Sequence, residues 1–386
     1  MTSEPQRSGV AGAEVIQALN EARERTLAIV ASVSDQDLER VHSELMSPLV
    51  WDLAHIAAFE DLWLVHRYGG EPLLRAEVAE MYDAFETPRA ERSLLPLLGP
   101  AGAREYLAEV RARAVDLIDE RGVGDGPVHQ MVLRHEQQHN ETMLQTLQLA
   151  ALPDYEPVGQ NGRQRRLGPE WSGLELVTVP SGQCTIGAAV RERSGGLRFA
   201  YDNERPRHRT DVPGYRIGRT PITNATYLTF VEGGGYERRE WWSDEGWAWK
   251  EEYDITKPHG WTPDHSAEWR LGTLLPLELH RPVVHISWFE ADAFARAHGA
   301  RLPTEIEWEK AATWDQDVSA TRRFPWGEEP PRGGVHADLD QLDRGPAAVG
   351  GYPAGASPYG CLDMIGGVWE WTSSDFRGYP GFVAHP

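Results

Sequence analysis

The pattern of apolar residues changes near the middle of the chain, and this change constrains the fold more than any other feature. Before residue 152, apolar residues recur at three- and four-residue spacing among charged ones, as in the stretch 13–33. Such spacing places them on one face of an α-helix. After Pro153, glycine, proline, tryptophan and short β-branched runs dominate, a pattern typical of brief strands and long loops. The sequence therefore predicts two parts built in different ways.

The first part, residues 12–152, predicts a four-helix bundle. Four amphipathic segments of this length can bury their apolar faces against one another. The last segment follows a Gly-Asp-Gly turn and begins with a proline, whose missing N–H costs little in the first turn of a helix. The four candidate helices are residues 13–33, 48–68, 103–121 and 127–152.

The second part, residues 171–386, predicts an irregular α+β domain. Brief strands are expected in Leu174–Pro180 and Arg281–Trp288, and helices in Trp288–His298 and Thr304–Thr313. Residues 153–170 are expected to form a linker, whose centre is the polar and basic segment Gly159–Pro169. At 386 residues the chain is too long for one ordinary core, so an α+β multidomain protein is predicted.

Charge and composition exclude several classes of partner. Lys and Arg number 38 and Asp and Glu 59, which gives a net charge of 38 − 59 = −21, so the surface repels nucleic-acid phosphates. No apolar run reaches the roughly 18–20 residues that span a bilayer, and the N-terminus lacks a secretory pattern. Cys184 and Cys361 cannot form a disulfide framework and are expected to be small buried apolar residues. A cytoplasmic protein without nucleic-acid or membrane partners is expected.

Two histidines suggest a metal site on the fourth predicted helix. His135 and His139 are four residues apart, so they share a helix face and could hold one ion. A chain with 14 histidines contains such a pair often by chance, so a polar helix face with two ordinary histidines is an equal alternative. Glu141 lies about 200° around the helix axis from His139 and should point away from the ion.

The third ligand should come from another helix, and His55 is the candidate. It stands in an apolar stretch, Trp51–Phe59, where an unpaired imidazole would be poorly solvated. The alternative is a core histidine bonded to a backbone carbonyl. Three imidazoles leave coordination positions open, as catalysis requires, but they do not choose between zinc and iron.

Several motifs resemble known families. The surroundings of His55 and of the His135/His139 pair resemble the DinB-like bundle, which holds a metal with one histidine on an early helix and an HxxxH pair on a later one. The second part resembles the formylglycine-generating-enzyme-like domain, a C-type-lectin-like fold, on five segments in the same order: residues 179–187, 203–206, 221–227, 301–309 and 367–372.

The two modules in this order resemble the sulfoxide synthases of ergothioneine biosynthesis. The resemblance implies an oxidoreductase with non-haem iron(II) as cofactor and dioxygen as co-substrate. It also implies a reaction that joins the sulfur of γ-glutamylcysteine to hercynine, a trimethylated histidine betaine, as a sulfoxide. His55, His135 and His139 would be the iron ligands.

The same resemblance implies further site residues. Arg89 and Arg92 match the arginines that bind the carboxylates of the thiol substrate, Gln138 matches a contact to the hercynine imidazole, and Tyr379 matches a proton-donating tyrosine. Without the resemblance, the arginines fit a solvated pair in a loop, and Tyr379 fits surface packing in a Gly/Pro-flanked turn.

Other functions remain open at this level. One is a zinc or nickel thiol transferase or hydrolase of the DinB-like type, and another is a ligand-binding relative without catalysis. Trp369 and Trp371 are expected in the core rather than in a binding site. Family members extend by some tens of residues beyond the position of Pro386, so the second domain is expected to be incomplete at its C-terminal end and the substrate pocket affected.

Overall fold

A computed structural model describes the whole chain except residues 1–3, 125–126, 158–172, 190–198, 340–344 and 385–386. The described chain divides into two compact units. The first runs to Pro157 and also takes in Arg270–Thr273, and the second contains most of the remaining residues. The expected centre of the linker, Gly159–Pro169, lies outside the described residues.

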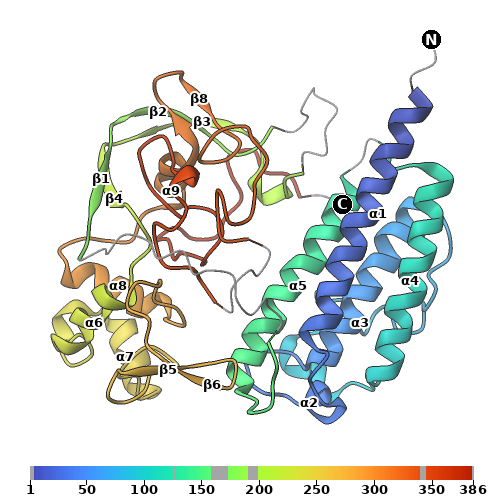
Figure 1. Cartoon of the computed structure of the whole chain (residues 1–386), viewed down its shortest axis with the longest axis horizontal. Helices are drawn as coiled ribbons and strands as arrows, with labels where there is room; N and C mark the ends of the chain where they lie inside the picture. The colour runs from blue at the N-terminus through green and yellow to red at the C-terminus, as the bar shows by residue number, and fades with distance from the viewer. Residues whose placement is uncertain (1–3, 125–126, 158–172, 190–198, 340–344, 385–386) are drawn as a thin grey trace. The chain divides into compact units, whose positions relative to one another are not determined.

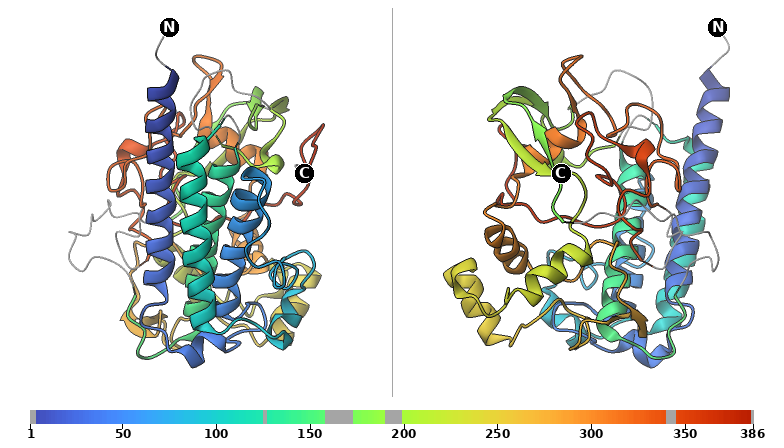
Figure 2. Two further views of the ribbon diagram at one scale, coloured as in Figure 1. Left: turned by 90° about the vertical axis from the view of Figure 1, so that its right-hand side faces the viewer. Right: turned by 60° about the vertical axis from the view of Figure 1, so that its left-hand side comes forward.

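The first unit is a four-helix bundle, as predicted. The helix α1 packs against both α4 and α5, and α3 packs against the same two helices, so that the four close into one bundle (Figures 1 and 2). A short helix, α2 (Asp35–Glu39), follows α1 and was not predicted. The four long helices are α1 (Glu4–Ile29), α3 (Leu49–Glu60), α4 (Pro100–Arg121) and α5 (Val128–Ala150).

The helix α3 is buried on almost every side. All of its residues except Phe59 are buried, and it continues directly into a π-helix, η1 (Asp61–Tyr68). A helix that is apolar all round lies inside a domain, and the polar side chains that it carries need partners there. Asp52 and His55 are two of these polar side chains.

Each long helix contributes one charged side chain to a buried ion-pair network. Arg23 of α1 and Arg111 of α4 each bind both Glu60 of α3 and Glu136 of α5, with closest N–O distances of 2.7 to 2.9 Å. The side chains are at most 8% exposed. Two positive and two negative charges balance, which makes their burial tolerable.

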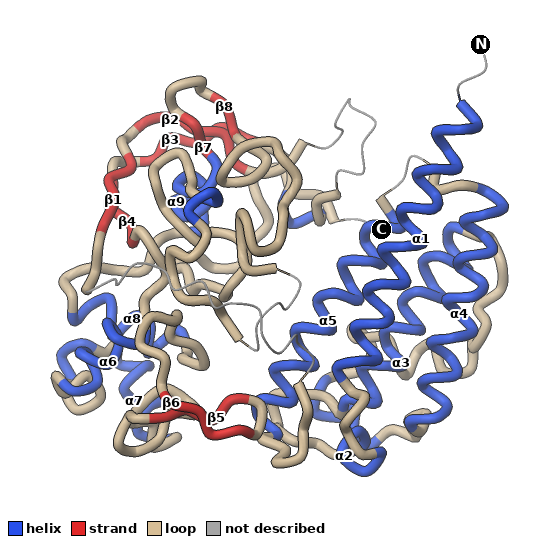
Figure 3. Tube along the Cα trace, in the orientation of Figure 1, coloured by secondary structure: helices blue, strands red, loops and turns tan. Residues whose placement is uncertain are grey.

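The second unit consists mostly of loops with short antiparallel strand pairs (Figure 3). In the first pair Leu176 lies opposite Gly218, and in the second Gly182 lies opposite Val212. The four pairs are β1 (Leu176–Val179) with β4 (Tyr215–Gly218), β2 (Gly182–Ile186) with β3 (His208–Val212), β5 (Ala267–Arg270) with β6 (Thr273–Pro276), and β7 (Trp314–Asp315) with β8 (Ala320–Thr321).

Short helices complete this unit. They are α6 (Asn224–Glu232), α7 (Asp244–Glu252), α8 (Trp288–Ala297) and α9 (Glu305–Thr313). Cys184 and Cys361 are both fully buried in apolar clusters, which confirms their predicted role. Single turns of 3-10 helix lie at η3 (Asp202–Glu204), η4 (Arg239–Trp241) and η5 (Pro353–Gly355), and a longer one, η2 (Arg89–Leu94), lies in the first unit.

Two expectations for the second unit are wrong. Arg281–Trp288 forms only an isolated bridge between Pro282 and Thr223, because Pro282 lacks an N–H and His285 takes a left-handed φ of 59°, which no strand accommodates. Trp369 and Trp371 are 80% and 51% exposed rather than buried. Their segment forms neither helix nor strand and runs over the surface, so its indoles have no core to enter.

Among the described residues, no helix is both long enough and apolar enough to cross a membrane.

Candidate metal centre

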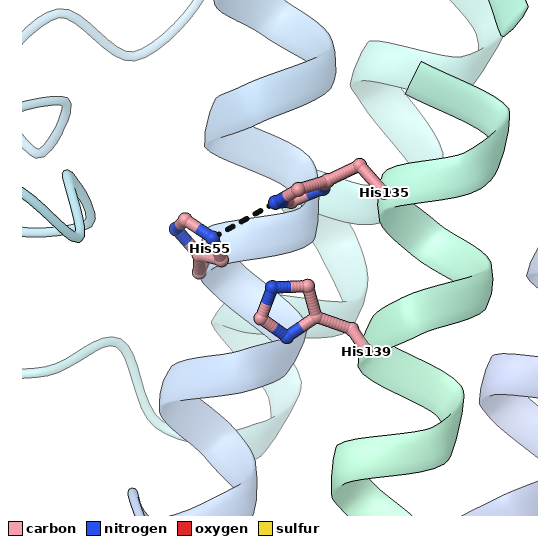
Figure 4. Close-up of side chains that lie close together, drawn as sticks. All are labelled: His55, His135 and His139. Atoms are coloured by element: carbon pink, nitrogen blue, oxygen red, sulfur yellow. Dashed lines mark hydrogen bonds between the residues drawn. The ribbon is translucent and has the colours of Figure 1, made fainter. Parts of the chain in front are cut away.

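Three histidines from two helices converge in the bundle. His55 comes from α3, and His135 and His139 come from successive turns of α5, so that one ring nitrogen of each lies within 4.8 Å of the others (Figure 4). This is the set that the sequence predicted. The α3–α5 contact brings the pair and the single histidine together.

Hydrogen bonds hold two of the three rings in a defined orientation. The Nδ1 atom of His55 lies 2.6 Å from the carbonyl oxygen of Tyr82, and Nδ1 of His139 lies 3.1 Å from a carboxylate oxygen of Asp52. Both acceptors place the ring proton on Nδ1, which leaves the Nε2 lone pair of each ring free to bind an ion.

Aromatic side chains pack against the rings. Trp51 stacks on His55 with ring centroids 4.5 Å apart, and Phe59 stacks on His135 at 3.7 Å. Stacking fixes the planes of these two rings, while hydrogen bonds fix the rotation and tautomer of His55 and His139.

Burial keeps the imidazoles neutral. Burial, together with the nearby His139 and Arg92, lowers the pKa of His55 to about 3 although its bond to Tyr82 opposes the change. Burial also holds the pKa of His135 well below its usual value, and the two neighbouring histidines add to this effect. A neutral imidazole is the form that binds a metal, so a cation at this site competes with few protons at neutral pH.

The arrangement fits a divalent transition metal. The Nε2 atoms of His55 and His135 are only 3.0 Å apart, and two lone pairs at that distance repel unless a proton or a cation lies between them. Imidazole nitrogen suits zinc, copper, iron and nickel, and three protein ligands leave open positions for a substrate.

The predicted arginines lie in a loop beside α3. Arg92 is 7% exposed, and its guanidinium lies 3.6 Å from the Trp51 ring centre while donating to the Thr87 carbonyl and the Ser47 hydroxyl. Burial and the neighbouring charge of Arg89 lower its pKa, and Asp52 opposes that effect. Arg89 is exposed and donates to the Leu45 carbonyl.

Gln138 and Glu141 lie on α5 next to the histidines. Gln138 is exposed and stands three residues after His135, so it shares a helix face with that ligand. Glu141 is exposed and does not belong to the cluster of potential ligands that the described residues form, in agreement with its predicted position on the helix.

Tyr379 lies in the second unit. Its hydroxyl donates to Glu309 at 3.1 Å, with Glu305 at 3.5 Å, and its ring packs 4.9 Å from that of His208. Burial and the two carboxylates raise the pKa of Tyr379 above its usual value. The hydroxyl is therefore protonated at neutral pH and occupied by carboxylate acceptors.

Sequence reasoning missed the residues that orient the ligands. Asp52 had a readable signal, because it stands three residues before His55 and so lies on the same face of α3. The Tyr82 carbonyl had none, since a backbone acceptor leaves no mark on residue type.

Comparison with protein families supports both modules. Residues 166–383 match the Sulfatase-modifying factor enzyme 1-like domain, and residues 18–143 match the DinB superfamily. A formylglycine-generating enzyme of Mycobacterium tuberculosis is 30% identical over 53% of this chain and 75% of its own length. The second module is therefore shared with enzymes that have no match to the first over that alignment.

Three relatives match nearly the whole chain. The protein named hercynine oxygenase in Mycolicibacterium smegmatis is 46% identical over 94% of this chain and 83% of its own length. The hercynine oxygenase of Mycolicibacterium thermoresistibile is 46% identical, over 96% and 82%. That of Mycobacterium tuberculosis is 44% identical, over 95% and 84%. Identity at this level across both modules shows that the chain belongs to the hercynine oxygenase family.

Proposed function

We propose that this protein is a hercynine oxygenase that uses iron(II) and dioxygen to join the sulfur of γ-glutamylcysteine to hercynine as a sulfoxide, in ergothioneine biosynthesis. The enzyme class and the substrate hercynine follow from the family to which the chain belongs. The iron, the thiol and the residue roles are our own assignments. The observation that carries the proposal is the convergence of the three histidines, one nitrogen each within 4.8 Å.

His55, His135 and His139 would hold the iron, which would supply dioxygen activation and a coordination position for a thiolate. Neutral imidazoles at all three positions keep the ion's positive charge available to a bound thiolate. The reaction balances with one dioxygen: the thiol S–H and one imidazole C–H are lost, one oxygen atom becomes the sulfoxide and the other leaves as water.

The arginines beside α3 would select the thiol. γ-Glutamylcysteine carries two carboxylates, and guanidinium groups bind carboxylates with paired hydrogen bonds. Two of the Arg92 donors, Nε and Nη1, are used within the protein, and among the described residues no partner is recorded for Nη2. Arg89 is exposed and would supply further donors, while Gln138 would bind the hercynine imidazole.

The first test is metal content. Protein purified after expression with iron should contain about one iron per chain, and His139→Ala should lose it, because two imidazoles seldom retain iron(II). His66→Ala is the matched control, since His66 is exposed on the same bundle and lies outside the predicted ligand set. No metal in the wild-type protein would refute the site.

The second test is turnover. The iron(II) form, incubated in air with hercynine and γ-glutamylcysteine, should yield the sulfoxide conjugate by mass spectrometry, and an anaerobic sample should yield none. Cysteine in place of the dipeptide should react more slowly, because it lacks the second carboxylate. Oxygen-independent turnover by a zinc-loaded sample would instead indicate a thiol transferase or hydrolase.

The role of Tyr379 as proton donor rests on the resemblance alone. Its hydroxyl donates to Glu309, so a proton given to substrate would require that bond to be replaced. If the role is right, Tyr379→Phe lowers kcat or diverts the product while iron content stays unchanged. Unchanged kcat and product in the variant would reduce Tyr379 to a packing residue.

A further inference from the structure

We infer that Asp52 is a positioning residue of the metal centre, which orients His139 through its carboxylate and sets the strength with which that imidazole binds the ion. The inference rests on the proposed three-histidine site. It concerns a residue that no sequence motif identified as part of the centre.

The contact has the geometry of an orienting bond. The Asp52 oxygen lies 3.1 Å from Nδ1 of His139, and the two side chains are 8% and 18% exposed. A carboxylate accepts but cannot donate, so it holds the ring proton on Nδ1 and directs the Nε2 lone pair toward the other two histidines. Figure 4 shows one nitrogen of the His139 ring facing that side.

His139 depends on this contact more than the other ligands do. His55 has the Tyr82 carbonyl and a stacked Trp51, and His135 has a stacked Phe59. Among the described residues, the ring contacts recorded for His139 are with the two other histidines only. Without Asp52 the ring would be free to rotate or to change tautomer.

The charge of Asp52 adds to its geometric effect. A carboxylate bonded to Nδ1 makes the opposite nitrogen a stronger electron donor, which strengthens the bond to a cation. Asp52 also lies close enough to Arg92 to interact with its charge. One buried carboxylate thus acts on a metal ligand and on the arginine assigned to the thiol.

The position of Asp52 on α3 explains how one helix can do both tasks. Asp52 and His55 are three residues apart, so they project from the same face toward α5. The acid reaches His139 while the histidine lies beside His135. One helix therefore supplies a ligand and the orienting group for another ligand.

The test compares iron(II) affinity, measured by chelator competition, in Asp52→Asn and Asp52→Ala. The asparagine variant removes the charge but keeps an acceptor, since its amide oxygen can still accept from Nδ1, whereas alanine removes both. Loss of such an outer-shell partner costs about 10- to 100-fold in metal affinity. We expect that loss for alanine and a smaller one for asparagine.

Asp61→Asn is the matched control for general damage to the fold. Asp61 is fully buried directly after α3 and accepts from the Leu74 amide and the Tyr106 hydroxyl, apart from the histidines. Its variant should lose stability yet bind iron(II) as the wild type does. Cobalt(II) as a spectroscopic probe should show altered visible bands for Asp52→Ala and unaltered ones for Asp61→Asn.

Two outcomes would overturn the inference while leaving the proposed function intact: an Asp52→Ala affinity within twofold of wild type, or an equal loss of affinity in Asp61→Asn. Absence of iron(II) binding by the wild-type protein would refute the metal site itself and this inference with it. Graded loss from wild type through asparagine to alanine supports it, because a purely structural role would not follow the hydrogen-bond acceptor.

Discussion

Two buried histidines of the bundle differ in how the protein satisfies them. His55 has the Tyr82 carbonyl on one nitrogen and His135 beside the other. His129 at the start of α5 is 1% exposed, and among the described residues neither of its ring nitrogens has a hydrogen-bond partner. Its ring packs edge-on against Tyr68, with centroids 4.6 Å apart. His129 is therefore tolerated only as a neutral ring.

This difference predicts an acid-sensitive bundle. Burial lowers the pKa of His129 from its ordinary 6.5 to about 4, so the folded state binds its proton more weakly than the unfolded chain does. Stability is then lost as pH falls below 6.5 and levels off below about pH 4, by up to about 3 kcal/mol at 1.36 kcal/mol per pKa unit. His129→Leu should show a smaller loss over this range in urea unfolding of metal-free protein.

The control for that prediction is His66→Leu. His66 is exposed at the end of η1 and bonds the Glu71 carbonyl. Its replacement should leave the pH dependence of the free energy of unfolding as in the wild type. Equal pH dependence in His129→Leu and the wild-type protein would show that His129 finds a hydrogen-bond partner in solution.

At the residue scale, side-chain chemistry was readable from the sequence only where spacing carried it. The His135/His139 pair is visible because a helix repeats every 3.6 residues, and His55 because a polar ring in an apolar stretch needs a partner. The surroundings of Trp369 and Trp371 were predicted wrongly. Burial of a tryptophan depends on what covers it, and its own residue type does not supply that.

At the scale of elements, the ion-pair network ties the four long helices together. Burial alone would raise the pKa of Glu60, but Arg111 and Arg23 lower it, so the carboxylate stays charged inside the bundle. Arg111→Met leaves Glu60 and Glu136 with one arginine between them. Removal of one partner from a buried pair costs about 3–5 kcal/mol, and we expect a loss of this size in the free energy of unfolding.

Arg104→Met on the same helix is the control for Arg111→Met. Arg104 forms a long exposed pair with Asp35 at 3.4 Å, and such surface pairs contribute about 0–1 kcal/mol. Urea unfolding of both variants should separate the two costs by at least about 2 kcal/mol. A loss below about 1 kcal/mol for Arg111→Met would mean that the remaining arginine or water neutralises both glutamates.

Long helices were predicted better than the short elements. The predicted ranges 103–121 and 127–152 correspond to α4 and α5 within a few residues, since periodicity accumulates over many turns. The short helices α6 and α7 were missed, because nine residues with several tryptophans and threonines give no clear period. Their N-caps, Thr223 and Ser243, were the available signals, as each accepts from a backbone N–H of the first turn.

At the scale of the whole molecule, the net charge of −21 acts on the proposed substrates unequally. γ-Glutamylcysteine has two carboxylates and one ammonium and so carries about one negative charge at neutral pH, whereas hercynine, a betaine with a neutral imidazole, carries no net charge. The field of the whole protein repels the anion at long range. Arg89 and Arg92 attract it only within a few ångströms.

Salt should therefore help the thiol more than it helps hercynine. The screening length falls from about 30 Å at 0.01 M to about 8 Å at 0.15 M, which shortens the repulsion to less than the radius of a protein of this size. We expect kcat/KM for γ-glutamylcysteine to rise several-fold over this range and that for hercynine to change by less than twofold. Hercynine serves as the internal control, because both values come from one enzyme preparation. A fall in kcat/KM for the thiol alone would show that the local attraction of the two arginines, which salt also screens, outweighs the field of the whole chain.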